Sequence, residues 1–178
     1  MHYILTWSNN NQNKGQVMGI RYIKIILVTF VGLQGWLYVA GNIANWDAAI
    51  AAIGYVLSMA DHQVYSTAIF PAVTSPALVT AAFLIVLAGE FLVGAFSLKG
   101  AWDLWKVRNA SADVFNGAKT FALMGPGMAM VVWFGGFIVI GGALFQMWQT
   151  QVGGNSFNGA FTYAITSGLV MLIVSVRD

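Results

Sequence analysis

Glu90 is the only acidic residue inside a long apolar stretch of this 178-residue sequence. An ionised carboxylate within a membrane costs a few kcal/mol unless it is paired, protonated or hydrated, so such a group is a functional candidate by default. Glu90 could exchange a proton or bind a cationic substrate. It could equally form an interhelical pair with Lys24, which lies inside the first apolar stretch, or hydrogen-bond to a neighbouring helix while protonated.

Two tryptophans and four small residues are further candidates. Trp36 and Trp133 are expected deep in the bilayer, where their rings pack in the core or form a cage for a cation, and we favour the core. Small residues in the third apolar stretch repeat at a spacing of seven, which places them on one face of an α-helix and favours close packing. This predicted helix-packing seam consists of Gly135, Gly136, Gly142 and Ala143.

Few other residues could support catalysis or hold a cofactor. There is no cysteine, and the only histidines are His2 in the N-terminal segment and His62 in a loop. Two axial ligands within the bilayer are therefore lacking, which argues against a haem b subunit, and Asp61 beside His62 is not spaced as a metal site. The known nucleophile, phosphate-binding and zinc motifs do not occur. We expect no enzyme activity, no metal and no cofactor.

The composition indicates what must position these residues. Hydrophobic residues make up 58% of the chain and charged residues only 8%. Four stretches are long enough to cross a hydrocarbon core about 30 Å thick as helices, and they lack the alternation of barrel strands. They cover residues 22–44, 77–98, 121–145 and 160–176. We therefore predict an all-α integral membrane four-helix bundle.

The parts outside the four spans are assigned separately. Residues 1–18 are polar and lack apolar periodicity, so they are predicted to form a disordered tail. Met18 is an alternative start to Met1, in which case this tail is not native. Residues 19–178 form a single transmembrane domain. The first outer loop, residues 45–76, is too long for a turn, and we expect a short interfacial helix that begins near Asp47.

The basic residues predict the orientation of the bundle. With four crossings, all eight Lys and Arg residues fall on one side, and the two outer loops contain none. Short loops rich in Lys and Arg stay in the cytoplasm, so both termini are predicted to be cytoplasmic. The net charge of +2 is scattered, which argues against nucleic-acid binding. The lipid bilayer is the expected partner, and a membrane protein partner or a homo-oligomer is left open.

Several short stretches make the chain resemble the DUF2165 family of small integral membrane proteins. They include YVLSM at 55–59, GEF at 89–91, FNGAK at 115–119 and, most specifically, WFGGFIVIGGALFQMWQ at 133–149. The resemblance covers about residue 19 to the C-terminus and implies a four-helix protein of the bacterial inner membrane whose function is uncharacterised. Family members tend to carry His at Tyr55, Asp at Ala60 and Glu at Ala143, so the resemblance implies the architecture and no shared activity.

Two functions of different classes remain open. The first is a non-catalytic accessory or scaffold subunit, in which the third span and its glycine seam serve packing. The alternative is a proton-coupled small-molecule transporter that uses Glu90, by analogy with small multidrug exporters of four helices and one membrane carboxylate. Loss of transport with intact assembly in Glu90→Gln would favour the second function.

Overall fold

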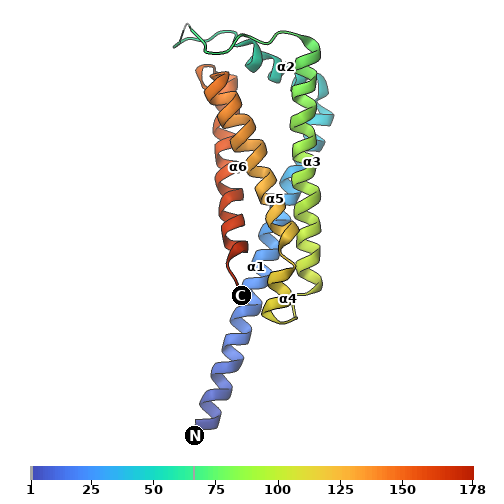
Figure 1. Cartoon of the computed structure of the whole chain (residues 1–178), viewed down its shortest axis with the longest axis vertical. Coiled ribbons are helices and arrows are strands. Elements are labelled where there is room, and N and C mark those ends of the chain that lie inside the picture. Colours follow the sequence, from blue (N-terminus) through green and yellow to red (C-terminus); the bar gives the residue numbers. More distant parts are fainter. Residues whose placement is uncertain (1, 66) are drawn as a thin grey trace.

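Four long apolar helical segments form the body of the molecule in a computed structural model of the chain (Figure 1). The structure describes residues 2–65 and 67–178, with side chains from Val17 onward. The segments are α1 (His2–Ala44), α3 (Pro76–Lys106), α5 (Thr120–Met130) continued by the π-helix η1 (Val131–Leu144), and α6 (Gln151–Ser175). The short helices are α2 (Trp46–Ser58), α4 (Ala112–Gly117) and the 3-10 turn η2 (Met147–Gln149). The predicted all-α bundle of four long apolar helices, with a short apolar helix between the first two, is confirmed.

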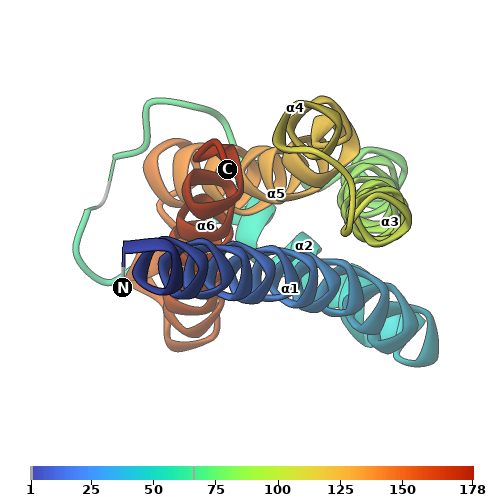
Figure 2. The same ribbon diagram turned by 90° about the horizontal axis from the view of Figure 1, so that it is seen from below.

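The packing order of the helices follows the chain. α1 packs against α3, α3 against α5, and α6 against α5 and η1, while α1 is strongly tilted across the bundle (Figure 2). Large apolar side chains remain exposed on every long segment, among them Leu37, Ile85, Val131 and Leu172. In water such continuous apolar surface would be a liability, whereas in lipid it needs no cover.

The basic side chains gather at one end of the bundle. α3 ends there at Lys106, α4 precedes Lys119, and Arg177 follows α6. Arg21 of α1 and Lys119 both pair with Asp178 at this end, where the C-terminus lies (Figure 1). We call it the basic end. The charge sorting within the bundle is therefore as the sequence indicates, and the placement of this end in the cytoplasm stays a prediction.

Two spans extend further than predicted. α3 continues eight residues past position 98 to Lys106, and α6 begins at Gln151, nine residues before position 160. Thr150 caps α6, since its side-chain oxygen accepts a hydrogen bond from the Gly153 amide at 3.1 Å. Gly153 also sits against the backbone of Met147, where a Cβ would come within 2.8 Å of the carbonyl carbon. Because it has no Cβ, Gly153 thus allows the helix to start directly against η2.

The N-terminal segment differs from the disordered tail that its composition predicts. α1 extends back to His2, so the backbone of residues 2–18 is helical and leaves the bundle beyond the basic end (Figure 1). Once a helix is nucleated and anchored, each further residue adds a hydrogen bond at modest entropic cost. The membrane span of α1 therefore supplies the nucleus that the polar segment lacks. The choice between Met1 and Met18 as the start stays a prediction.

The predicted glycine seam of the third span is wrong. Nothing lies within 4 Å of a Cβ built on Gly135 or Gly136, and Ala143 is exposed. The reason is the π-helical backbone of η1, in which the amide of Phe145 bonds to the carbonyl of Ile140, five residues back, at 3.0 Å. Its turns are wider than those of an α-helix, so residues seven apart no longer share a face. Of the four residues, Gly142 does pack closely, against Phe157.

The close helix contacts run between α1, α3 and α5 instead. A Cβ on Gly35 of α1 would lie 2.8 Å from the carbonyl oxygen of Glu90 in α3. A Cβ on Gly100 of α3 would lie 2.5 Å from the Cα of Ala122 in α5. Because real Cβ atoms do not approach backbone this closely, only glycine lets these helices meet, as small residues do in membrane bundles.

Candidate functional site

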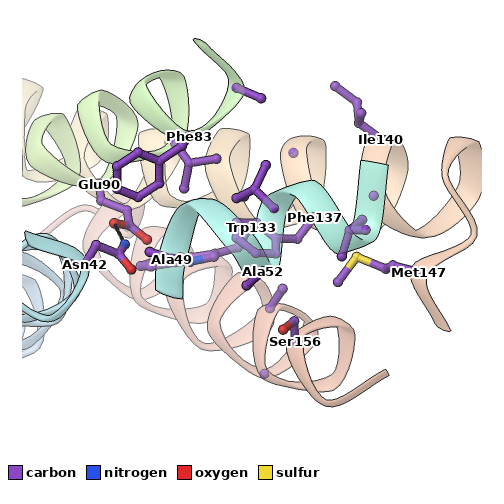
Figure 3. A pocket seen from close by; sticks show the side chains of 18 of the residues that line it. Asn42, Ala49, Ala52, Phe83, Glu90, Trp133, Phe137, Ile140, Met147 and Ser156 are labelled. Carbon is purple, nitrogen blue, oxygen red and sulfur yellow. Dashed lines mark hydrogen bonds between the residues drawn. The ribbon is translucent and has the colours of Figure 1, made fainter. Parts of the chain in front are cut away.

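A cavity of about 610 Å³ lies among α1, α2, α3, η1 and α6. We call it the Glu90 pocket. Figure 3 shows Glu90 and Asn42 joined by a hydrogen bond at one end, Ile140 and Met147 at the other, and α2 lying across the space between them. Most of the wall is apolar. A few polar groups in a largely apolar cavity of this size are typical of sites for drug-sized molecules.

Glu90 is buried at the middle of α3, with 2% of its surface exposed. The amide nitrogen of Asn42 donates a hydrogen bond of 2.8 Å to one carboxylate oxygen, Oε2. Among the pocket residues there is no Lys, Arg or His, so the carboxylate lacks a cationic partner within the pocket. This arrangement suits the recognition of a cation or of a hydrogen-bond donor supplied by a ligand.

The pair of Glu90 and Lys24, one of the possibilities that the sequence leaves open, does not form. Gly35 is the residue of α1 that lies against the backbone of Glu90, and Lys24 is eleven residues earlier, about 16 Å along the helix axis. Lys24 instead forms an ion pair with Asp178 at 2.5 Å. The carboxylate that neutralises Lys24 therefore comes from beyond the end of α6.

Three aromatic rings form the wall beside Glu90. Tyr38 of α1 and Tyr163 of α6 are hydrogen-bonded through their hydroxyls, and their ring centroids are 5.2 Å apart. Trp133 of η1 lies 6.0 Å from the ring of Tyr38 and 5.3 Å from that of Tyr163. Trp133 is buried, as expected, and it also faces the pocket, so its ring can contact a bound cation.

Trp36 lies outside the core, contrary to expectation. It is 44% exposed and stacks on Phe91 of α3, with ring centroids 6.3 Å apart. Tyr38, two residues later on α1, lines the pocket. Two positions correspond to about 200° around an α-helix, so the two rings must face opposite ways. Trp36 therefore faces away from the pocket, toward lipid.

Asn42, Tyr38 and Tyr163 are pocket residues that the sequence reasoning did not identify. Asn42 carries a usable signal, because an amide near the end of an apolar span needs a hydrogen-bond partner. The tyrosine pair carries none, since its two members are 125 residues apart. Among the residues whose side chains are described, no three His, Cys, Asp or Glu side chains are grouped as a metal site.

A second polar cluster, distinct from the pocket, lies at the basic end. Asp178 pairs with Arg21 at 2.7 Å, with Lys24 at 2.5 Å and with Lys119 at 3.6 Å. All four side chains are at most 5% exposed. The ammonium groups of Lys24 and Lys119 also donate to the carbonyl oxygen of Val176, at 2.6 and 2.7 Å. These residues, Arg21, Lys24, Lys119 and Asp178, form what we call the Asp178 cluster, which joins α1 and the start of α5 to the segment after α6.

The electrostatics of the cluster favour the ionised form of Asp178. Burial alone would raise the pKa of this carboxyl group. The hydrogen bonds from Lys24 and Arg21, together with the charges of Lys24 and Lys119, outweigh burial and hold the pKa below its usual value. Asp178 is therefore ionised over the whole physiological pH range.

Comparison with known protein families gives a match that covers most of the chain. The family described as "Predicted small integral membrane protein (DUF2165)" matches residues 20–177, which include all four spans, the Glu90 pocket and most of the Asp178 cluster. The chain belongs to the DUF2165 family. Comparison with curated proteins and with solved structures found no match. This DUF2165 protein is thus an integral membrane protein with four candidate spans, in contact with the lipid bilayer.

Proposed function

We propose that this protein binds a small, largely apolar molecule that carries one cationic or hydrogen-bond-donating group, in the Glu90 pocket. The observation that carries the proposal is the buried carboxylate of Glu90 in an apolar cavity that offers it no cationic partner. Leaving such a group inside a membrane protein is costly, so the cavity fits a role that uses the charge.

The walls of the pocket support this ligand chemistry. The ligand's polar group would pair with Glu90, and the faces of Trp133 and the tyrosine pair would contact its charge. The apolar part would extend toward Ile140 and Met147 at the far end (Figure 3). A neutral, purely apolar ligand would leave the carboxylate unpaired on binding, which is unfavourable.

Access to the pocket is most readily supplied by α2. This helix has no buried residue, and its packing within the bundle is mainly against α3, with Trp46 edge-on to Phe83 at 4.9 Å. Segments with few buried contacts open at low free-energy cost. Displacement of α2 would expose the pocket while the four long helices stay in place.

A bound ligand in the Glu90 pocket would distinguish this proposal from an accessory or scaffold role, which does not require the cavity. The proposal keeps one part of the transporter hypothesis, the recognition of a cation by Glu90. Transport would further require a path from Glu90 to the basic end, where Val93, Ser97 and Leu104 fill the bundle with no exposed surface. The role as a subunit of a larger complex stays a prediction.

The test is the binding of tetraphenylphosphonium, a permanently charged apolar cation, to purified protein in detergent. Glu90→Gln keeps the size of the side chain and an acceptor for Asn42, so it should fold normally and bind at least about tenfold more weakly. Asp47→Asn, which removes an exposed carboxylate that does not line the pocket, should bind as the wild type does. Equal affinity of wild type and Glu90→Gln would overturn the proposal.

A further inference from the structure

We infer that the basic end holds a second binding site, for a phosphate-type anion, and that an anionic lipid headgroup fills it in the membrane. The inference does not depend on the Glu90 pocket. It starts from the charge balance of the Asp178 cluster, in which three basic side chains share one side-chain carboxylate.

The remaining acidic side chains do not correct this imbalance. Asp103 pairs with Lys99 at 2.6 Å and Lys106 at 3.1 Å on the outside of α3. Asp113 pairs with Arg177, and both side chains are largely exposed. Among the described residues, three buried cationic groups thus share one side-chain carboxylate, and their other hydrogen bonds go to backbone carbonyls and to the side-chain oxygen of Asn116. Buried charges are normally paired, so a further anion is expected nearby.

Two half-buried residues cover the cluster, and both have unused donors. The carbonyl oxygen of Arg108 accepts a hydrogen bond from Arg21 at 2.8 Å. The side-chain oxygen of Asn116 accepts from Lys119 at 2.7 Å and from the amide of Asp178 at 3.3 Å. The Nε of Arg108 and the Nδ2 of Asn116 are buried and have no hydrogen-bond partner. An anion that binds over Arg108 and Asn116 would satisfy these donors and add the missing negative charge.

The depth of this end suits a phospholipid headgroup. Tyr22, Trp102 and Trp105 are exposed around it, and Tyr22 meets Trp105 edge-on at 5.9 Å. Exposed Trp and Tyr side chains are typical of the membrane interface, where headgroup phosphates lie. Basic pockets between membrane helices at this depth are known to hold anionic headgroups.

The experiment compares lipid retention by native mass spectrometry, with phosphatidylglycerol and phosphatidylcholine added to delipidated protein. Wild type should retain phosphatidylglycerol preferentially. Asn116→Asp supplies a carboxylate within the cluster, keeps the oxygen acceptor and removes the unused donor, so it should retain phosphatidylglycerol about fivefold less. Asn109→Asp adds the same charge at the same end on an exposed residue outside the cluster, and it should behave as wild type.

A second variant and a second ligand complete the test. Arg108→Gln removes an unused donor without touching the Asp178 ion pairs, and it should also weaken retention, which covers the case in which Asn116→Asp does not fold. Inorganic phosphate at millimolar concentration should raise the thermal midpoint less than phosphatidylglycerol does; an equal rise would assign the site to a soluble phosphate. The site itself is refuted if wild type retains phosphatidylglycerol no better than phosphatidylcholine and phosphate does not raise the thermal midpoint. It is also refuted if Asn109→Asp and Asn116→Asp lose phosphatidylglycerol equally.

Discussion

The contact between α3 and α5 can be tested by the addition of a single methyl group. In Gly100→Ala, the new Cβ would lie 2.5 Å from the Cα of Ala122 and the carbonyl carbon of Phe121. Carbon atoms in contact are normally about 3.5 to 4.0 Å apart, so the two helices must separate by about 1 Å. Overpacking of this kind costs about 1 to 3 kcal/mol, and for a chain of this size each kcal/mol lowers the melting temperature by about 2 to 4 °C. We therefore expect the melting temperature to fall by about 2 to 12 °C.

The matched control is Gly135→Ala, which lies in the seam that the spacing of seven predicts. Nothing lies within 4 Å of its added Cβ, so the melting temperature should stay within about 2 °C of wild type or rise slightly, since alanine is less flexible than glycine when unfolded. The seven tryptophans allow both variants to be followed by intrinsic fluorescence in detergent. A larger loss in Gly135→Ala than in Gly100→Ala would refute the close contact of α3 with α5 at Gly100.

Three further predictions concern the core, the Asp178 cluster and the orientation. Trp133→Ala should lose about 3 to 5 kcal/mol of stability, whereas Trp36→Ala, on the lipid face, should lose much less; thermal unfolding of both compares them directly. Asp178→Asn should lower stability by about 3 kcal/mol at neutral pH. Because the folded-state pKa of Asp178 is depressed, its contribution is fully present above the unfolded pKa of about 3.9 and is lost as the pH falls through the folded pKa. The difference in melting temperature between wild type and variant should therefore be constant from pH 7 to about 5 and shrink in strong acid, and a difference that peaks in acid would contradict it. Single cysteines at Lys106 and Gln63 should react with impermeant reagents from opposite sides of the membrane, with no background because the chain has no cysteine.

The architecture could be predicted because the membrane leaves few alternatives. Continuous apolar stretches must form helices in lipid, and their number and the placement of Lys and Arg follow directly from the sequence. Because these stretches are apolar all round, the sequence does not show which side of each helix faces the inside of the bundle. Trp36 and Trp133 are both tryptophans within apolar spans, yet Trp36 faces lipid and Trp133 faces the pocket. A span that is apolar all round has no polar face that would indicate its orientation.

The candidate site was only partly predictable, for two physical reasons. Glu90 can be identified from the sequence because a charge in an apolar stretch is costly. Its neighbours cannot, because the packing of α1 against α3 decides that Gly35, and not Lys24, lies beside Glu90. The π-helical turns of η1 change which residues share a face, and no feature of hydropathy distinguishes them from α-helical turns. The neutralising partner of Lys24 lies 154 positions away in the sequence, beyond the reach of any local spacing rule.

The most direct test of the proposed pocket exchanges the carboxylate of Glu90 with the amide of Asn42, its hydrogen-bond partner. In the double variant Asn42→Asp with Glu90→Gln, the carboxylate passes from α3 to α1, between side chains that are 2.8 Å apart in the wild type. Binding of tetraphenylphosphonium, weakened in Glu90→Gln alone, should recover most of the way to the wild-type affinity, because the negative charge returns to the same end of the cavity. If the double variant folds and binds no better than Glu90→Gln, the charge of Glu90 does not recognise a ligand, and the proposed function is contradicted.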